Sequence, residues 1–417
     1  MRDFNAPLFS NFIWNTVGSV YYQGCLWLLT VLVVRFSFDF QNSGYLALAM
    51  SIGNIMFALG SYNMRTYQVA DVHNRFSLSN YIGLRVFTDI VALFICLIYS
   101  FFISRSFSSF AVCSAYVFFK FDEAFVNVIY GFEQKKQRLD LVGKSYVIRG
   151  SLYIAVFTFG MLALSSLFYS ICLMALSGCL VTILFDIRHV KNQWRFVELV
   201  PYISKYDLIY LLKTCFPSVI ALFVSTFVVS GARQYFAFIY GEEALGIYAS
   251  VATPCVVIQV LAQNLYQPII GPIAIDYRTG LLEKSIKKVK LSLVVVAGVG
   301  IFLSLLLSLL SHPLLSALYG SGILPYVDLF FPVLVVSTLA ACLGLLTDLL
   351  IVFGHMKSTL LINLVALAVT MSLLRFACSA WYMNGINIAL LFGYSAALLL
   401  GLFILLRSLC SSAGLDR

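Results

Sequence analysis

Charged residues are scarce in this sequence of 417 residues. Only 11% are Asp, Glu, Lys or Arg, while 61% are hydrophobic and the mean hydropathy is +0.95. An average soluble domain has about a quarter of its residues charged. The composition therefore excludes an ordinary soluble enzyme and indicates a membrane protein.

Metal-binding and disulfide patterns are also missing. The ten cysteines are scattered through hydrophobic stretches, with no C-x-x-C motif and no His at ligand spacing. Cysteines in such positions usually act as small core residues. We therefore expect no metal site and no cofactor.

Long apolar runs follow one another along the chain. A spanning helix takes about 20 apolar residues, and continuous runs predict helices rather than the alternating strands of a barrel. We expect an all-α integral membrane protein with about twelve spanning helices. They are predicted near 12–34, 43–62, 81–102, 107–130, 145–164, 166–185, 211–232, 244–266, 291–310, 329–352, 358–379 and 385–407.

The 27 Lys and Arg residues orient these helices. Arg35, Arg105 and Arg233 fall on one side of the membrane, Lys120 and Arg375 fall inside helices, and all the others fall on the opposite side. The side rich in Lys and Arg is normally cytoplasmic. Both termini are therefore predicted in the cytoplasm, and the net charge of +9 reflects topology rather than a nucleic-acid partner.

Weak similarities between the two halves suggest an internal repeat. Arg35 and Arg233 each end an odd-numbered predicted helix, and the dipeptide Tyr-Gln occurs at 67–68 and again at 266–267. Related halves are typical of transporter folds, which bind substrate in a cleft between them. The expected lobes are 1–200 and 201–417, with six helices each.

Five ionisable residues are predicted at similar depth in the first lobe: Asp89, Lys120, Asp122, Glu123 and Arg149. Lys120 and Glu123 are spaced to pair on one helix. Three acids against two bases leave one carboxylate unmatched. This carboxylate is a candidate site for a coupling ion, H⁺ or Na⁺, because buried ionisable groups often mark ion pathways. The alternative is a structural network of ion pairs.

Asp348 is a second coupling candidate, in the tenth predicted helix. A side chain that reaches the membrane interface is the simpler interpretation.

Arginines at the predicted helix ends suit an anionic substrate. Arg35, Arg65 and Arg233 are candidates because guanidinium groups bind phosphate in a bidentate manner. Polar residues form a stripe on the first helix, including Asn15 and Tyr22, and Tyr248 opens the eighth. Such stripes line a wet cavity or hold helices together.

Several segments resemble a known family. They are SYNMRTYQVADV (61–72), YGFEQKKQRLDLVGKSYVIRG (130–150), GEEALGIYA (241–249) and LYGSG (318–322). Over almost the whole chain the sequence resembles Wzx-type flippases for O-antigen repeat units, in the multidrug/oligosaccharidyl-lipid/polysaccharide (MOP) exporter superfamily.

The resemblance implies a MATE-like fold of two six-helix lobes in the bacterial inner membrane. It implies flipping of an undecaprenyl-pyrophosphate-linked oligosaccharide to the outer leaflet, for lipopolysaccharide O-antigen or capsule biosynthesis. The implied partners are this lipid-linked substrate, a coupling ion, membrane lipids and the polymerase and chain-length proteins of the pathway. The first predicted helix carries no basic residue, so a cationic cavity would depend on Arg35, Arg65, Arg149 and Arg233.

Two alternatives stay open. One is a MATE-like antiporter for drugs or metabolites. The other is a membrane-embedded glycosyltransferase or polymerase of the same pathway. Enzymes of that kind usually need a large outer loop with charged catalytic residues, whereas the predicted outer loops are short and nearly uncharged. We therefore expect a transporter with no catalytic residues.

Overall fold

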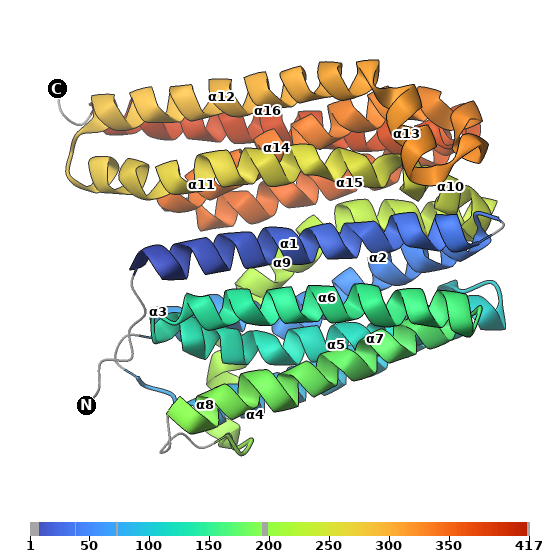
Figure 1. Ribbon diagram of the computed structural model, residues 1–417. Coiled ribbons are helices and arrows are strands. Elements are labelled where there is room, and N and C mark those ends of the chain that lie inside the picture. Colours follow the sequence, from blue (N-terminus) through green and yellow to red (C-terminus); the bar gives the residue numbers. More distant parts are fainter. Residues whose placement is uncertain (1–7, 38, 72–73, 194–198, 415–417) are drawn as a thin grey trace. The chain divides into compact units, whose positions relative to one another are not determined.

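The computed structural model describes residues 8–37, 39–71, 74–193 and 199–414. Within these ranges every regular element is a helix (Figure 1). The chain divides into two compact units. Unit 1 comprises Met1–Thr226 and Ala237–Gly246, and unit 2 comprises Phe227–Phe236 and Ile247–Arg417. The lobe boundary near residue 200 stays a prediction.

Eleven helical stretches of the described chain are long and apolar enough to cross a membrane. A further helix, α5 (Phe107–Lys135), has 29 residues but carries Lys120, Asp122 and Glu123 near its middle. Together they confirm the prediction of an all-helical membrane protein with about twelve spanning helices. The stretches are Ile13–Phe36, Gln41–Ala70, Leu78–Ile103, Leu139–Ala163, Leu167–Lys191, Lys205–Tyr240, Glu242–Tyr277, Leu282–Leu309, Ser321–Val352, Met356–Trp381 and Asn384–Ser408.

In unit 1, α1 packs along α6, α2 lies against α4 and α5, and α7 contacts both α5 and α6. Helix α7 continues through a π-helical turn, η1, into α8. Residues of α9 belong to both units, as do those of α10. The bounds are α1 Leu8–Phe36, α2 Gln41–Ser61, α3 Met64–Ala70, α4 Leu78–Ile103, α6 Leu139–Ala163, α7 Leu167–Val181, η1 Thr182–Ile187, α8 Arg188–Gln193, α9 Lys205–Tyr240 and α10 Glu242–Ala252.

In unit 2, α15 packs along α16, and α14 contacts α11, α12 and α16. A short 3₁₀ turn around Pro254, η2, separates α10 from α11, because proline cannot continue the helical hydrogen-bond ladder. The bounds are η2 Thr253–Cys255, α11 Val256–Arg278, α12 Leu282–Leu309, α13 Ser311–Tyr319, η3 Ser321–Leu329, α14 Phe330–Val352, α15 Met356–Trp381 and α16 Asn384–Gly414.

Glycines allow α1 and α6 to approach closely. A Cβ atom on Gly18 would lie 2.3 Å from the Gly143 carbonyl oxygen, and one on Gly143 would lie 2.0 Å from the Trp14 carbonyl oxygen. Small residues at helix contacts are typical of membrane proteins, where packing rather than the hydrophobic effect drives helix association. The backbone contact of these two helices therefore depends on both glycines.

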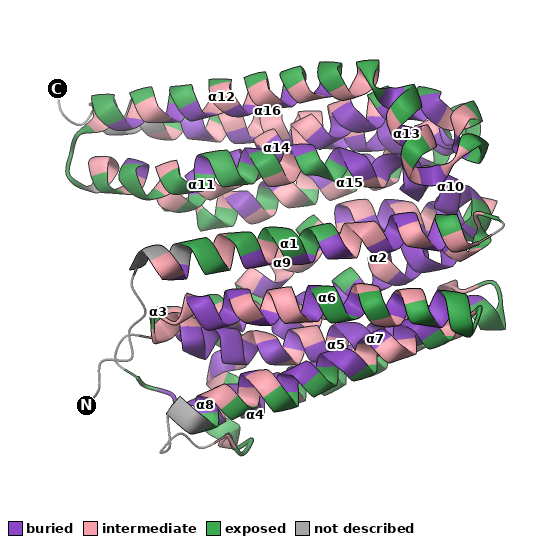
Figure 2. Cartoon of the chain, viewed as in Figure 1, coloured by how far each residue is buried: buried purple, intermediate pink, exposed green. Residues whose placement is uncertain are grey.

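Exposed residues recur along the helices (Figure 2), and many of them are large and apolar. Phe101 and Phe102 of α4 are 66% and 73% exposed, and Phe94 is 61% exposed. Exposed apolar surface on this scale marks an interaction surface. The hydrocarbon interior of a bilayer provides the matching environment.

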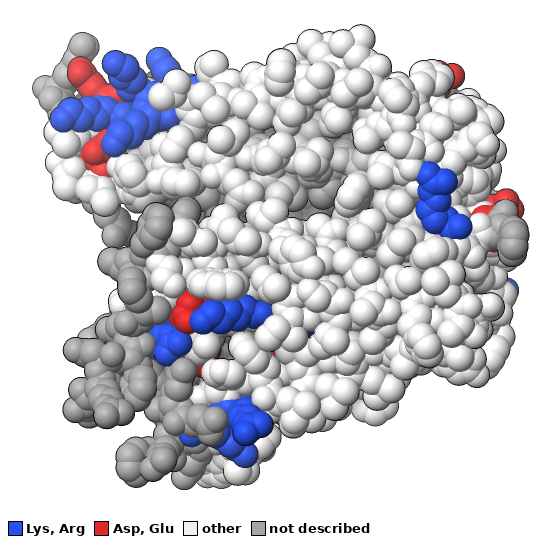
Figure 3. Space-filling model, in the orientation of Figure 1, with Lys and Arg blue, Asp and Glu red and all other residues white. Residues whose placement is uncertain are grey.

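Basic side chains gather at helix ends. Figure 3 shows them at the end of the α11–α12 hairpin, followed by a wide band of surface without charge. The first turns of α12 contribute Lys284, Lys287, Lys288 and Lys290. This end is the one predicted to face the cytoplasm. The sidedness stays a prediction, and residues 1–7 and 415–417 at the termini lie outside the described residues.

Asp71 organises the end of unit 1 at which α3 is followed by α4. Its carboxylate accepts hydrogen bonds from the backbone N–H of Arg75 at 3.0 Å, the backbone N–H of Phe76 at 3.3 Å and the Tyr81 hydroxyl at 3.0 Å. Lys135 Nζ lies 3.6 Å away. Burial alone would raise the pKa of Asp71, but these donors outweigh burial and hold its pKa below the usual value.

Candidate functional site: a buried charge network in unit 1

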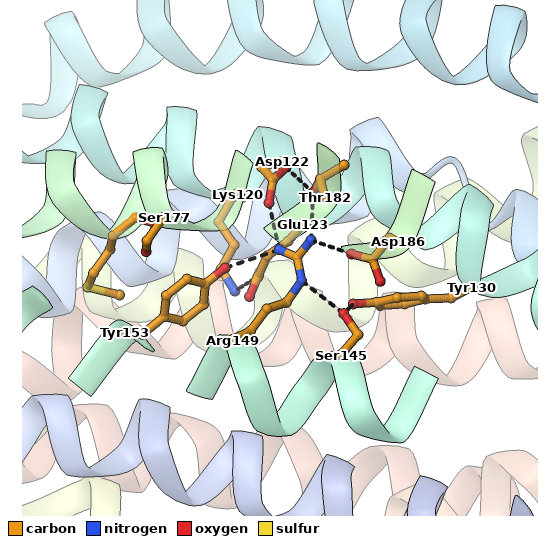
Figure 4. A network of polar contacts seen from close by, with 11 residues as sticks. Lys120, Asp122, Glu123, Tyr130, Ser145, Arg149, Tyr153, Ser177, Thr182 and Asp186 are labelled. Atoms are coloured by element: carbon orange, nitrogen blue, oxygen red, sulfur yellow. Dashed lines mark hydrogen bonds and ion pairs between the residues drawn. The ribbon is translucent and has the colours of Figure 1, made fainter. Parts of the chain in front are cut away.

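Arg149 is the centre of a network of polar side chains inside unit 1 (Figure 4). The side chain projects from α6 and is 1% exposed. Its Nη1 lies 2.6 Å from Asp122 Oδ2 of α5, and its Nη2 lies 3.0 Å from Asp186 Oδ2 of η1. One guanidinium group therefore balances two buried carboxylates, which leaves these three residues with one excess negative charge.

Hydroxyl groups complete the coordination of Arg149. Nη2 donates to Thr182 Oγ1 at 2.5 Å, and that hydroxyl donates to Asp122 Oδ1 at 2.6 Å. Nη1 also contacts the Tyr153 hydroxyl at 3.2 Å, and Nε contacts Ser145 Oγ at 3.4 Å. Buried charges persist when their hydrogen-bonding capacity is used in this way. The Arg149 cluster is therefore the part of the network whose polar groups are satisfied.

Lys120 and Glu123 form the ion pair that their spacing on α5 predicted. The Lys120 ammonium also lies 5.4 Å and 5.8 Å from the ring centres of Phe119 and Tyr116. Glu123 Oε1 is shielded from solvent and makes no hydrogen bond. This pair is therefore less completely satisfied than the Arg149 cluster.

Asp89 is the unmatched carboxylate of the network. It is fully buried on α4, and neither of its oxygens makes a hydrogen bond. A Cβ atom on Gly60 of α2 would lie 2.4 Å from Asp89 Oδ1. Arg85, one turn earlier on α4, is equally buried but donates from Nη1 to the Gly60 carbonyl at 2.6 Å. Its Nε and Nη2 make no hydrogen bond.

Two charged residues of the network were absent from the sequence prediction. Arg85 was assigned to the basic flank of its helix, although its spacing to Asp89 places both on one face of α4. Asp186 lies one residue beyond the predicted end of its span, near the end of the apolar run. With them the network contains four acids and three bases, namely Asp89, Asp122, Glu123 and Asp186 with Arg85, Lys120 and Arg149.

Aromatic rings connect Arg65 and Tyr22 to the same region. Tyr22 of α1 stacks on Tyr146 at a centroid distance of 5.2 Å and lies 6.0 Å from Tyr153. Arg65 donates from Nε to Gln134 at 2.9 Å, and its guanidinium lies 6.0 Å from the Tyr130 ring. The structure therefore brings Arg65, Arg149 and Tyr22 into one part of unit 1.

The polar stripe on α1 faces α6. Asn11 donates to the Gln137 carbonyl at 2.6 Å and accepts from the Asp140 backbone N–H at 3.0 Å. Asn15 is half-buried where α1 passes Gly143. Of the two sequence interpretations, these contacts favour a stripe that holds helices together. Arg35 is exposed in the last turn of α1, near the opposite end of the helix.

Three predicted residues lie in unit 2. Arg233 is half-buried on α9, and its shielded Nε makes no hydrogen bond. Tyr248 lies within electrostatic range of Arg233 and donates to Asn387 Oδ1 at 2.8 Å. Asp348 is half-buried beside the phenol of Tyr266. The charge of Arg233 thus acts on Tyr248 within unit 2.

Where α5 is followed by α6, Arg138 and Asp140 form a bidentate pair. Arg138 Nε donates to Asp140 Oδ1 at 2.8 Å, and Nη2 donates to Oδ2 at 3.1 Å. The hydrogen bonds that Arg138 donates to the Asp140 carboxylate raise the pKa of Arg138. No group of three or more His, Cys, Asp or Glu side chains in the described ranges could hold a metal ion.

Solved structures share the fold. An inward-facing multidrug resistance MATE family transporter of the MOP superfamily is 13% identical, with a TM-score of 0.74 over 99% of this chain and 100% of that chain. An outward-facing transporter of the same description is 12% identical, with a TM-score of 0.66 over 98% and 96% of the two chains. A MOP superfamily transporter from Pyrococcus furiosus is 12% identical, with a TM-score of 0.61 over 98% and 96%.

The description of the Pyrococcus furiosus protein states that a reversed polarity of its binding pocket suggests a different function. No protein-family model matches this chain, and no curated protein sequence matches it. At 12% to 13% identity the likeness establishes the fold alone. The chain has the fold of MATE transporters of the MOP superfamily.

Proposed function

We propose that this protein is an ion-coupled flippase of the bacterial inner membrane, with both termini in the cytoplasm. Its substrate is an undecaprenyl-pyrophosphate-linked oligosaccharide for O-antigen or capsule synthesis, delivered to polymerase and chain-length proteins. The MATE-type fold supports transport by alternating access, because both inward-facing and outward-facing structures share it. The proposed lobes are 1–200 and 201–417.

The unpaired Arg233 is the observation that supports an anionic substrate. Among the described residues, no carboxylate lies within ion-pair distance of this guanidinium, which sits inside a spanning helix. A charge in the membrane interior is costly and usually has a partner or a functional role. A pyrophosphate group would supply the missing negative charge, with Tyr248 beside it. Arg65, Arg149, Arg35, Asn15 and Tyr22 remain proposed contacts of the head group and glycan.

Arg233→Ala is expected to slow flipping by about tenfold or more, because a charged hydrogen bond contributes about 1.5–3 kcal/mol. The assay uses proteoliposomes with purified protein and a fluorescent undecaprenyl-pyrophosphate disaccharide, and measures the fraction accessible to an impermeant quencher. The matched control is Arg375→Ala, since Arg375 is exposed on α15. Arg105→Ala is less suitable, because Arg105 donates to the Ile239 carbonyl at the end of α9.

Equal rates for the two variants would remove Arg233 from the substrate path. Movement of a cationic dye such as ethidium, without movement of the lipid-linked saccharide, would instead favour the drug antiporter. That alternative is supported by the two multidrug resistance structures with the same fold.

We assign ion coupling to the unit 1 network, with Asp89 as the carboxylate that binds H⁺ or Na⁺. Its two oxygens make no hydrogen bond, whereas Asp122 is held by Arg149 and Thr182, and Glu123 by Lys120. Asp348, beside Tyr266, is the candidate of unit 2.

Asp89→Asn is expected to abolish the response of transport to an imposed ion gradient, because the amide cannot change its charge. The same vesicles measure the flipping rate with and without the gradient. Glu243→Gln is the control, since Glu243 is exposed at the start of α10. A gradient response that persists in Asp89→Asn would leave this carboxylate with a structural role only.

A further inference from the structure

A partly enclosed cavity lies beside the Arg149 cluster, at the end of unit 1 predicted to face the cytoplasm. Between α5, α6, η1 and α8 there is about 200 Å³ of unfilled space, part of which is open to solvent. Its polar lining consists of Tyr130, Glu133, Asp186 and His189. The other lining side chains are apolar. The polar lining groups therefore come from α5 and from the segment formed by η1 and α8.

Glu133 is the unusual member of this lining. The residue is 3% exposed on α5, and its Oε2 is shielded from solvent without any hydrogen bond. An isolated buried carboxylate is costly, and a bound proton removes the charge. Glu133 therefore presents a group that needs a proton or another cation within the cavity.

Within the part of the chain that the structure describes, no base forms an ion pair with Glu133. The charged groups within electrostatic range are Arg138, Asp140 and Asp186. Arg138 is committed to Asp140 in a bidentate pair, and Asp140 also holds Lys144 at 3.4 Å. Arg149 of α6 is already bonded to Asp186, Arg188 and Lys191 of α8 are exposed, and His189 is half-buried. Lys135 of α5 lies 3.6 Å from Asp71, and Arg65 of α3 donates to Gln134.

The inner wall of the cavity belongs to the Arg149 cluster. Asp186 and Tyr130 lie on one side of the Arg149 guanidinium, opposite Tyr153 (Figure 4). The Tyr130 hydroxyl is 2.8 Å from Ser145 Oγ, which contacts Arg149 Nε. A proton that crosses the cavity from Glu133 thus arrives at the carboxylate that pairs with Arg149.

His189 occupies the outer wall and is half-buried. Its Nδ1 lies 2.8 Å from the Phe185 carbonyl oxygen, which fixes the ring. Each ring nitrogen of a histidine can donate or accept a hydrogen bond, so His189 is suited to exchange protons with water. The lining therefore contains three groups able to carry a proton, namely His189, Glu133 and Asp186, of which Asp186 is bonded to Arg149.

We propose that this cavity is the cytoplasmic entry for the coupling proton of the transporter. Glu133 takes a proton from water beside His189 and transfers it to the Asp186 carboxylate. Glu133 is then ionised again, Asp186 is neutral, and Arg149 keeps only Asp122 as its charged partner. The inference rests on the proposed function, because it assigns a route to the same coupling network.

Infrared spectroscopy of the full chain in lipid nanodiscs tests the route without a substrate. As the pH is lowered, wild type should gain a protonated-carboxyl band from Glu133, and Glu133→Gln should lack it. Proton uptake after a pH jump should slow by about a hundredfold in Glu133→Gln, the usual contribution of a positioned proton-transfer group. Glu133→Asp should restore much of that rate.

Glu283→Gln is the control, because Glu283 is an exposed carboxylate in the first turn of α12. It should leave the band and the uptake rate unchanged. If Glu133→Gln fails to fold, Asp186→Asn is the variant that tests the proposal. It should keep the Glu133 band but take up protons more slowly than wild type, because the acceptor carboxylate is missing. A Glu133→Gln spectrum and uptake rate equal to those of wild type would overturn the proposal, as would an Asp186→Asn variant with wild-type uptake. Neither measurement needs flipping, so failure of the proposed function remains a separate result.

Discussion

Arg149→Met is expected to destabilise unit 1 by about 3–5 kcal/mol, the usual cost of removing one partner from a buried ion pair. The variant would leave Asp122 and Asp186, which are 4% and 6% exposed, without their shared cation. Methionine roughly keeps the length and apolar volume of the side chain, so the change isolates the charge. Thermal unfolding in detergent or nanodiscs measures the effect.

Arg188→Met is the control for this prediction, because Arg188 is exposed in the first turn of α8. Its free energy of unfolding should lie within a few tenths of a kcal/mol of the wild-type value, as is usual for surface substitutions. Adding Asp122→Asn and Asp186→Asn to Arg149→Met should recover part of the loss. Equal stability of the two arginine variants would show that the network contributes little to folding.

Gly143→Leu is expected to separate α1 from α6 and to prevent accumulation of folded protein. Its Cβ would lie 2.0 Å from a backbone oxygen of α1, and backbone cannot move aside as a flexible side chain can. Overpacking usually costs about 1–3 kcal/mol, and a clash with backbone on a long helix contact should exceed that range. Size-exclusion chromatography and thermal unfolding measure the loss.

Gly298→Leu provides the matched control within a spanning helix. Gly298 is exposed on α12, and no atom lies within 4 Å of its added Cβ. Leucine is also a better helix former than glycine, by somewhat less than about 1 kcal/mol. This variant should be at least as stable as wild type. A Gly143→Leu protein that behaves in the same way would contradict the close approach of the two helices.

The sequence predicted the helical framework well, because hydropathy alone determines which stretches can cross a bilayer. It also predicted the Lys120–Glu123 pair, since contacts within one helix follow from spacing. The same reasoning missed α3, α8 and α13, which are too short to appear as spans.

The charge network was predicted only in part. Depth along a helix was sufficient to group Asp89, Asp122 and Arg149, but not to decide their partners. Those depend on which faces of α4, α5, α6 and η1 meet, and this is a property of packing. Arg85 and Asp186 were overlooked because a charged residue near the end of an apolar run looks like an interfacial residue.

The π-helical turn η1 keeps one buried face continuous from α7 into α8. Buried residues recur every four positions here, at Met174, Gly178, Thr182, Asp186 and Val190. In a regular α-helix each such step rotates about 40° past a full turn, so four steps would turn Val190 about 160° away from Met174. The wider turn at η1 absorbs part of this drift. If these residues formed a regular α-helix instead, Asp186 would lie about 80° around the helix from Gly178, and the second carboxylate would turn away from its arginine, while the hydropathy of the span would be unchanged.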